Sequence, residues 1–246
     1  ELLHNEKAGE CLKNILQFFF SGKEPKIVLS SMEKELIVCK YHAKNVFELP
    51  NSIDLKETEI FTRQFPVKAP LRILYMGRIV KSKGIDYIIQ ALDILWRKSV
   101  PYKFIMAGSG PEEKDYIKEL SKLPGNCFEF KGLVSGPLKT RLLKECDIFL
   151  LPSLYEGLPV SLLEAMSFGL VPVVTDVGSI STVVKNGETG LIVEVKSSVQ
   201  IAEAIESLVR YDDLFERLSM NSRRYVFENH NPVEYANKLN DIYDKT

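Results

Sequence analysis

Beyond Pro70, short apolar runs alternate along the chain with stretches whose apolar residues recur every three or four positions. The run LRILYMG at 71–77 is typical of a buried strand, because strands covered on both faces are apolar throughout. The stretch at 84–98 places Ile88 and Leu92 at helical spacing and predicts a helix with one apolar face. This alternation predicts a parallel sheet with helices on both faces.

The same reading extends to the end of the chain. Strands are predicted at 71–77, 102–108, 127–132, 148–153, 171–176 and 189–194. Helices are predicted at 84–98, 111–123, 137–147, 159–168 and 198–211, and two further helical stretches close the chain. We therefore expect a Rossmann-like, doubly wound α/β fold. Its ligand site should lie at the carboxyl ends of the strands, where the strand order reverses.

The first part of the chain differs from the rest. Residues 1–53 contain helices predicted at 7–20 and 32–42 and strands predicted at 25–30 and 45–51, which make only two strand–helix units, too few for an independent core. We interpret them as the end of a first Rossmann-like domain. Residues 54–69 are polar and irregular, which indicates a linker. Residues 70–246 form a complete second domain, whose last helix, 231–246, is expected to cross back toward the first.

Composition limits the function classes. The 246 residues are 45% hydrophobic and 26% charged, as in globular proteins. The net charge of -1 gives no overall basic field, so we expect no nucleic-acid partner. No apolar run of about 18 residues occurs, so we expect no transmembrane helix, and the polar start predicts no signal peptide. The start ELLHNEKAGE lacks an initiator Met, so the chain is expected to begin inside a larger protein.

Candidate metal ligands are scattered. The four cysteines share no C-x-x-C spacing, which favours reduced thiols in the cytoplasm over a zinc or redox site. The three histidines are isolated, and no Asp-x-Asp pair occurs. We therefore predict no metal site and no cofactor.

The first candidate motif is GRIVKSKG at 77–84. Arg78 and Lys83 flank the turn that follows the first strand of the second domain. Two cations at the carboxyl end of a strand suit a diphosphate, because Arg forks across oxygens and Lys acts as a point charge. Two solvated loop cations remain an alternative.

The second motif is MAGSGPEE at 106–113. Gly108 and Gly110 follow a strand and precede a helix, as in a turn that contacts a nucleotide. The dinucleotide fingerprint G-x-G-x-x-G is incomplete, since Glu113 replaces its third glycine. A plain tight turn therefore remains open.

The third motif is PSLYEGLPVSLLEAMSFGLVPVV, which begins at residue 152. Gly157 lets the backbone approach a ligand, and Pro159 suits a first helical turn. The free N–H groups of Val160 and Ser161 then favour an anion in front of the helix.

Two acids lie beside this predicted anion site. Glu156 precedes the helix and Glu164 lies one turn inside it. A carboxylate next to a phosphate is unfavourable unless it faces another group. Hydroxyl groups donate hydrogen bonds that carboxylates accept, so one acid suits a sugar and the other a ribose. Two surface glutamates near a helix start are the alternative.

The spacing from Glu156 to Glu164 resembles the E-x7-E of group 1 retaining glycosyltransferases, the GT4 type, which have the two-domain GT-B fold. The resemblance covers most of residues 46–243, in blocks such as ILYMGRIVKSKGIDYIIQAL, FIMAGSGP and CDIFLLPSLYEGLPVSLLEAMSFGLVPVVTDVGS. Ser52, Ser179, Ser181 and Thr182 depart from the family pattern and put only loop shape in doubt. Most of the family's first domain is not in this sequence.

The resemblance implies roles for individual residues. Arg78 and Lys83 match the cations that hold the donor diphosphate, and Glu156 matches the acid at the donor sugar, which makes these three the catalytic candidates. Glu164 matches the acid that binds the ribose. The remaining expected donor-nucleotide contacts are Gly77, Gly108, Ser109, Gly110, Pro111, Leu133, Val134, Gly157, Leu158, Pro159, Val160 and Ser161.

The implied reaction is sugar transfer, with retention, from a UDP-sugar or GDP-sugar to an acceptor hydroxyl in polysaccharide or glycoconjugate biosynthesis. Acceptor candidates are a glycan, a lipid-linked glycan or a small molecule. The resemblance is compatible with peripheral attachment to the cytoplasmic face of a membrane. Three alternatives stay open: a fragment that binds a nucleotide sugar without turnover, a nicotinamide oxidoreductase and a sugar-nucleotide epimerase.

Overall fold

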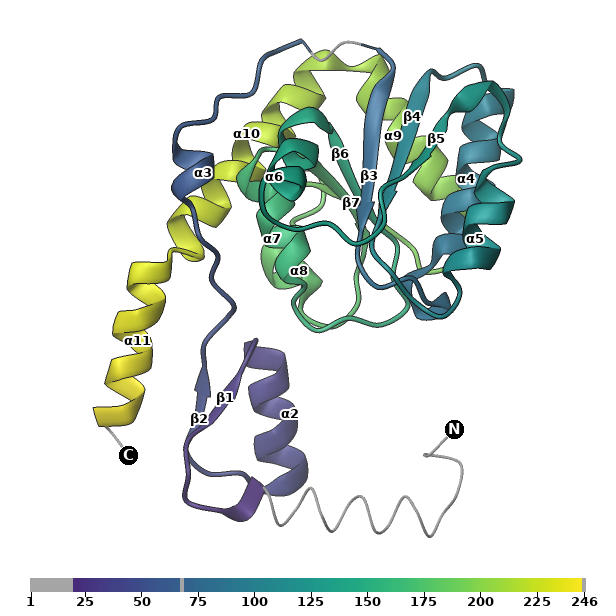
Figure 1. The fold of residues 1–246 in the computed structure, drawn as a ribbon. Coiled ribbons are helices and arrows are strands. Elements are labelled where there is room, and N and C mark those ends of the chain that lie inside the picture. Colours follow the sequence, from purple (N-terminus) through teal and green to yellow (C-terminus); the bar gives the residue numbers. More distant parts are fainter. Residues whose placement is uncertain (1–19, 67–68, 245–246) are drawn as a thin grey trace, which may run out of the picture. The chain divides into compact units, whose positions relative to one another are not determined.

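The computed structural model describes residues 20–66 and 69–244 (Figure 1). The chain divides into two compact units, one of Glu1–Asn51 with Pro232–Thr246 and the other of Ser52–Asn231. The helix predicted at 7–20 lies outside the described residues except at its last position.

The larger unit is built on a six-stranded parallel sheet with the order β5-β4-β3-β6-β7-β8. Its first strand is central, and the chain runs outward to one edge before it returns to build the other. This is the doubly wound Rossmann order, which confirms the predicted fold class. The strands are β3 (Leu71–Met76), β4 (Tyr102–Ala107), β5 (Phe128–Phe130), β6 (Ile148–Leu151), β7 (Val171–Thr175) and β8 (Leu191–Val193).

Helices cover both faces of the sheet (Figure 1). Helix α4 packs against α9, and α7 packs against α10. The helices of this unit are α3 (Lys56–Glu59), α4 (Ile85–Arg97), α5 (Glu113–Leu120), α6 (Gly136–Glu145), α7 (Val160–Ser167), α8 (Ile180–Val183), α9 (Ser198–Arg210) and α10 (Asp212–Asn229), with short 3-10 turns at Lys81–Lys83 and Pro124–Asn126.

The core follows from the apolar pattern. Ile73 and Leu74 of β3, and Ile88 and Leu92 of α4, are fully buried. Each such side chain stabilises the fold by about 1.5–3 kcal/mol through removal of apolar surface from water. Helix α8 was not expected, because four residues inside a serine-rich turn carry no helical periodicity.

The segment predicted as a linker, residues 54–69, carries the short helix α3 and belongs to the larger unit, to which arginine side chains attach it. Arg63 donates to the carbonyl oxygens of Phe168, at 3.2 Å, and Cys146, at 2.8 Å. Arg223 donates to the carbonyl oxygens of Thr58 and Phe61. The polar composition of the segment did not predict this attachment. Guanidinium groups make it by binding backbone carbonyl oxygens, which every residue carries and which no sequence pattern distinguishes.

The smaller unit contains β1 (Lys26–Val28) and β2 (Val46–Glu48), which pair in parallel, and α2 (Ser31–Tyr41) between them. The Ser30 side chain caps α2 by accepting from the N–H of Glu33. Ile37 and Tyr41 of α2 form a small buried cluster with Ala43 and Val46. Helix α11 (Pro232–Asp244) belongs to the same unit.

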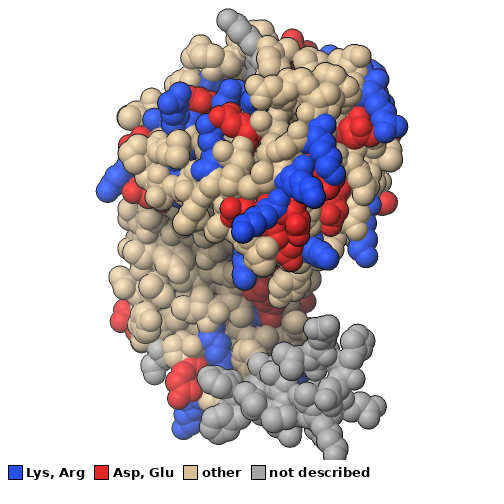
Figure 2. All heavy atoms as spheres, turned by 45° about the vertical axis from the view of Figure 1, so that its right-hand side comes forward, with Lys and Arg blue, Asp and Glu red and all other residues tan. Residues whose placement is uncertain are grey.

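Charges of both signs are interspersed on the face that Figure 2 shows, with broad areas of uncharged residues between them. None of the helices in residues 20–66 and 69–244 has the length and apolar character that a membrane span requires.

Candidate functional site

A cavity of about 600 Å³ opens where β3, β4 and β5 end. This is the edge of a doubly wound sheet at which ligands bind. Loops after the three strands form most of its wall, and α6 and α7 form the rest. The lining residues are Met76, Gly77, Arg78, Gly108, Ser109, Gly110, Pro111, Leu133, Val134, Lys139, Ser161 and Glu164.

Most residues predicted to contact a nucleotide line this cavity. The predicted residues that do not line it are Lys83, Glu156, Gly157, Leu158, Pro159 and Val160. Met76 and Lys139 line it and were not predicted. A lysine in an amphipathic helix looks like any solvent-facing cation, so only its place in the fold distinguishes Lys139.

The glycines of the second motif bring the loops after β3 and β4 together. A Cβ on Gly110 would lie 2.0 Å from the carbonyl oxygen of Ile79, and a Cβ on Gly108 would lie 1.8 Å from that of Gly77. The N–H of Ile79 donates to the carbonyl of Ser109 at 2.9 Å. The two loops thus approach backbone to backbone, which side chains at these glycines would prevent.

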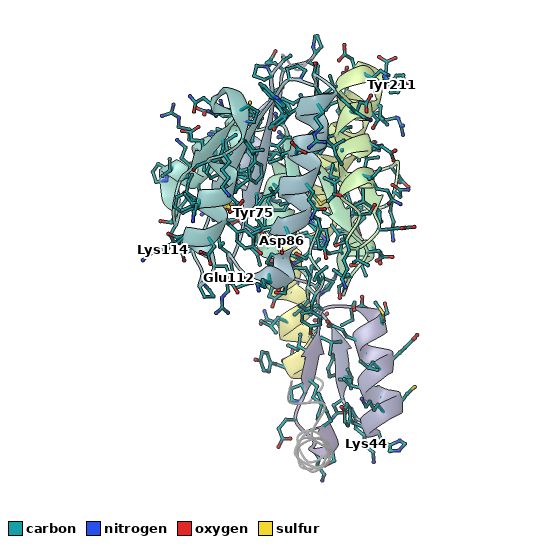
Figure 3. The ribbon with its side chains drawn as sticks, turned by 90° about the vertical axis from the view of Figure 1, so that its right-hand side faces the viewer. Lys44, Tyr75, Asp86, Glu112, Lys114 and Tyr211 are labelled. Carbon is teal, nitrogen blue, oxygen red and sulfur yellow. The ribbon has the colours of Figure 1, made fainter. Side chains whose placement is uncertain are left out.

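Arg78 begins the loop after β3 and lines the cavity. The buried Tyr75 hydroxyl donates to its carbonyl oxygen at 2.6 Å and anchors the loop. Burial and the nearby Glu156 raise the pKa of Tyr75, so this hydroxyl stays protonated. Figure 3 labels Tyr75 together with Asp86 of α4 and Glu112, the N-cap residue of α5. Within the described part of the chain, the Arg78 guanidinium has no ion-pair partner.

Each acid of the third motif has its own lysine. The Lys83 Nζ lies 2.7 Å from Oε1 of Glu156, whose side chain is only 8% exposed. The Ser153 hydroxyl donates to the same oxygen at 2.7 Å. The Lys139 Nζ lies 2.6 Å from Oε1 of Glu164. The two lysines reduce the repulsion that a carboxylate beside an anion site would otherwise cause.

The start of α7 offers backbone donors. Pro159 is the N-cap residue, and no side chain caps the helix. Among the described residues, the N–H groups of Val160 and Ser161 have no hydrogen-bond acceptor. The exposed N–H groups and the helix dipole make this end of α7 suitable for an anion.

The part of the chain that the structure describes has no group of three or more His, Cys, Asp or Glu side chains placed to hold a metal ion. The prediction of a metal-free site stays a prediction.

A Rossmann-like domain with strand order β5-β4-β3-β6-β7-β8 and a cavity at the strand ends has the arrangement of a nucleotide-binding domain. The sequence model of the glycosyl transferases group 1 family matches residues 56–225. The chain belongs to this family.

Individual relatives agree with this assignment. The chain is 28% identical over 227 residues to an uncharacterized glycosyltransferase of Methanocaldococcus jannaschii, covering 91% of this chain and 57% of that protein. It is 32% identical over 230 residues to the capsular polysaccharide biosynthesis glycosyltransferase CapM of Staphylococcus aureus, covering 88% and 57%. The chain thus spans a little over half the length of both relatives.

The fold is also that of a solved structure, Anabaena HepE in complex with UDP. The TM-score is 0.82 at 15% sequence identity, and the match covers 100% of this chain and 71% of that one.

Proposed function

We propose that this chain carries the donor site of a retaining glycosyltransferase, which moves a sugar from a nucleoside diphosphate sugar to an acceptor hydroxyl in glycan biosynthesis. The observation that carries the proposal is the cavity at the strand ends, which is lined by Arg78, by Ser161 of the uncapped helix α7 and by the lysine-paired Glu164. Among the described residues Arg78 has no ion-pair partner.

The charges suit a diphosphate leaving group. When the bond between the anomeric carbon and the phosphate oxygen breaks, negative charge grows on the diphosphate. Arg78 and the α7 N–H groups are preorganised donors for that charge, which is the largest contribution in many enzymes. The acceptor oxygen bonds to the anomeric carbon, and its proton passes to the departing phosphate oxygen. No metal is needed in this proposal.

Glu156 fits a role at the donor sugar. Its carboxylate is held by Lys83 and Ser153, and its side chain is mostly buried. A fixed carboxylate accepts hydrogen bonds from sugar hydroxyls and orients them. The complex of HepE with UDP supports a nucleoside diphosphate as the ligand, and the name of CapM supports polysaccharide biosynthesis as the setting.

Titration calorimetry of this chain with UDP, GDP and ADP tests the binding half of the proposal. We expect one of them to bind, and Arg78→Met to weaken it about 10-fold or more, because a charge-assisted hydrogen bond contributes about 1.5–3 kcal/mol. Arg97→Met is the control. Arg97 lies in α4, its side chain is 76% exposed and pairs with Asp93, and it does not line the cavity, so the affinity should stay unchanged.

The transfer half needs the protein with its complete first domain. Incubation with a matching nucleotide sugar and an acceptor glycan should give a product whose anomeric configuration, read by NMR, equals that of the donor. An inverted product contradicts the retaining mechanism. Failure of all three nucleotides to bind contradicts the donor site itself.

A further inference from the structure

A second cavity lies between residues 61–65 and helix α10. Its volume is about 350 Å³, within the range of about 300–1,000 Å³ that is usual for small-molecule sites. Gly169, which follows α7, lines this cavity, whereas Ser161 in the first turn of α7 lines the cavity at the strand ends. The two cavities therefore lie at opposite ends of α7, and among the described residues they share no lining residue. The second one is called the linker cavity below, because it borders the segment predicted as a linker.

Part of the lining of the linker cavity is apolar. It consists of Phe61 and Phe65, which are partly buried, and of Met220 in α10, which is 58% exposed. The ring of Phe61 packs against that of Phe168, with 5.6 Å between centroids, and the ring of Phe65 packs against that of Phe215 at 6.4 Å. Both rings are thus held in place, and their remaining surface suits the apolar part of a ligand.

The two arginines in the lining differ in their counterions. The guanidinium of Arg63 has a carboxylate partner, Asp147, at 3.3 Å. Within the part of the chain that the structure describes, the hydrogen bonds of Arg223 go to the carbonyl oxygens of Thr58 and Phe61, and no carboxylate pairs with it. A guanidinium has five N–H donors, so Arg223 retains donors beyond these two bonds.

Burial makes the missing counterion of Arg223 costly. The residue is partly buried, and the loss of water around its guanidinium lowers its pKa. It stays charged at neutral pH, because arginine does not lose its proton in proteins. Carbonyl oxygens carry only partial charges, whereas a carboxylate accepts shorter and stronger, charge-assisted hydrogen bonds from a guanidinium. A ligand anion would therefore supply the full negative charge that the protein does not place there.

Glu216 of α10 also lines the linker cavity. It is exposed, and no ion pair joins it to Arg223 in residues 20–66 and 69–244. An exposed carboxylate is hydrated and screened by salt, so its repulsion of an incoming anion is weak. The partly buried cation has the stronger influence on the charge of a ligand.

We propose that the linker cavity binds a small organic carboxylate, with the carboxylate bound by Arg223 and the apolar body against the two phenylalanines and Met220. The planar guanidinium suits a carboxylate because the two groups can form paired, parallel hydrogen bonds. This site is separate from the donor site, and the inference does not depend on the proposed function.

Fluorine NMR titrations of this chain test the proposal with two probes of similar shape. The first is para-trifluoromethylbenzoate, and the second is the neutral para-trifluoromethylbenzyl alcohol. We expect the benzoate to bind about 10-fold more tightly or better, because its carboxylate accepts hydrogen bonds from a charged group. Arg223→Met should remove this preference.

A second pair of variants keeps the test independent of the attachment that Arg223 makes to the linker. Met220 is largely exposed, so Met220→Glu and Met220→Gln alter the lining without opening the core. Both remove the same apolar contact, but only Met220→Glu adds a negative charge. We expect the preference for the benzoate to fall about 5-fold in Met220→Glu relative to Met220→Gln, the effect of a like charge about 4 Å away in water.

Two controls locate the bound probe. Arg224→Met changes the next residue of α10, which is exposed, bonds Asn221 at 2.8 Å and does not line the linker cavity. Arg78→Met removes the cation of the cavity at the strand ends. Neither substitution should change the affinity for the benzoate, and unfolding midpoints show which variants are intact.

Equal affinity for the two probes, or binding of neither, overturns the inference. So does a preference for the benzoate that is the same in Met220→Glu and Met220→Gln, or that persists in a folded Arg223→Met variant. Loss of benzoate binding in Arg78→Met overturns it too, because the anion then lies at the strand ends. The proposed function stands in each of these cases, since nucleotide binding is measured separately.

Discussion

The ion pair of Lys83 and Glu156 can be tested by removing its charges singly and together. The two side chains are 21% and 8% exposed, and their charged atoms lie 2.7 Å apart. Without Lys83, the Glu156 carboxylate keeps only the hydroxyl of Ser153 as a partner in the described structure. A mostly buried charge would then be left without its counterion.

Loss of one partner from a fully buried pair costs about 3–5 kcal/mol. Because Lys83 is one-fifth exposed, water compensates part of this, and we expect Lys83→Met to lower the free energy of unfolding by about 2 kcal/mol. Glu156→Gln leaves an ammonium that can turn toward water, and about 1 kcal/mol is expected. The double variant leaves no unpaired charge and should also cost about 1 kcal/mol, a coupling of about 2 kcal/mol.

Urea unfolding followed by the fluorescence of Trp96, the single tryptophan and a residue of α4, measures this cycle in the larger unit. The control cycle uses Lys98 and Glu206, which are also 2.7 Å apart but are 45% and 23% exposed. Their coupling should be below about 1 kcal/mol. Additive effects of Lys83→Met and Glu156→Gln would refute the reasoning, since the pair would then not hold Glu156 in place.

Three further outcomes are expected. Arg63→Met should destabilise the larger unit by about 3 kcal/mol, because the side chains of Arg63 and Asp147 are only 8% and 10% exposed. Burial raises the pKa of Asp147, and the unpaired carboxylate is costly only while it is ionised. The decrease in the free energy of unfolding, measured in urea, should therefore be largest above that pKa and shrink as the pH falls through it; a decrease that does not change with pH contradicts this. Burial also raises the pKa of Cys146 to about 12, so iodoacetamide at pH 8 should modify the exposed Cys39 and spare Cys146, as peptide mass spectrometry would show; equal labelling contradicts it. Gly110→Ala should cost about 2 kcal/mol in urea and weaken nucleotide binding, and a neutral effect in both assays would mean that the loops can separate freely.

The sequence by itself determined the fold class and the position of the site. Unbroken apolar runs and helical periodicity are local properties, so they identified β3, α4 and the alternation that leads to a parallel sheet. The doubly wound topology then placed every loop after a strand at one edge. Most nucleotide candidates, such as Gly108 and Glu164, accordingly line the cavity.

The tertiary structure alone decided how the charges are paired. Lys83 and Glu156 follow different strands, β3 and β6. Lys139 and Glu164 lie in different helices. The partners in each pair are far apart in the sequence, so no local sequence pattern predicts that they meet. The attachment of Arg63 to Asp147 and to backbone carbonyls was hidden in the same way. Periodicity records which side of an element faces the core, whereas a partner for a charge depends on which elements meet in space.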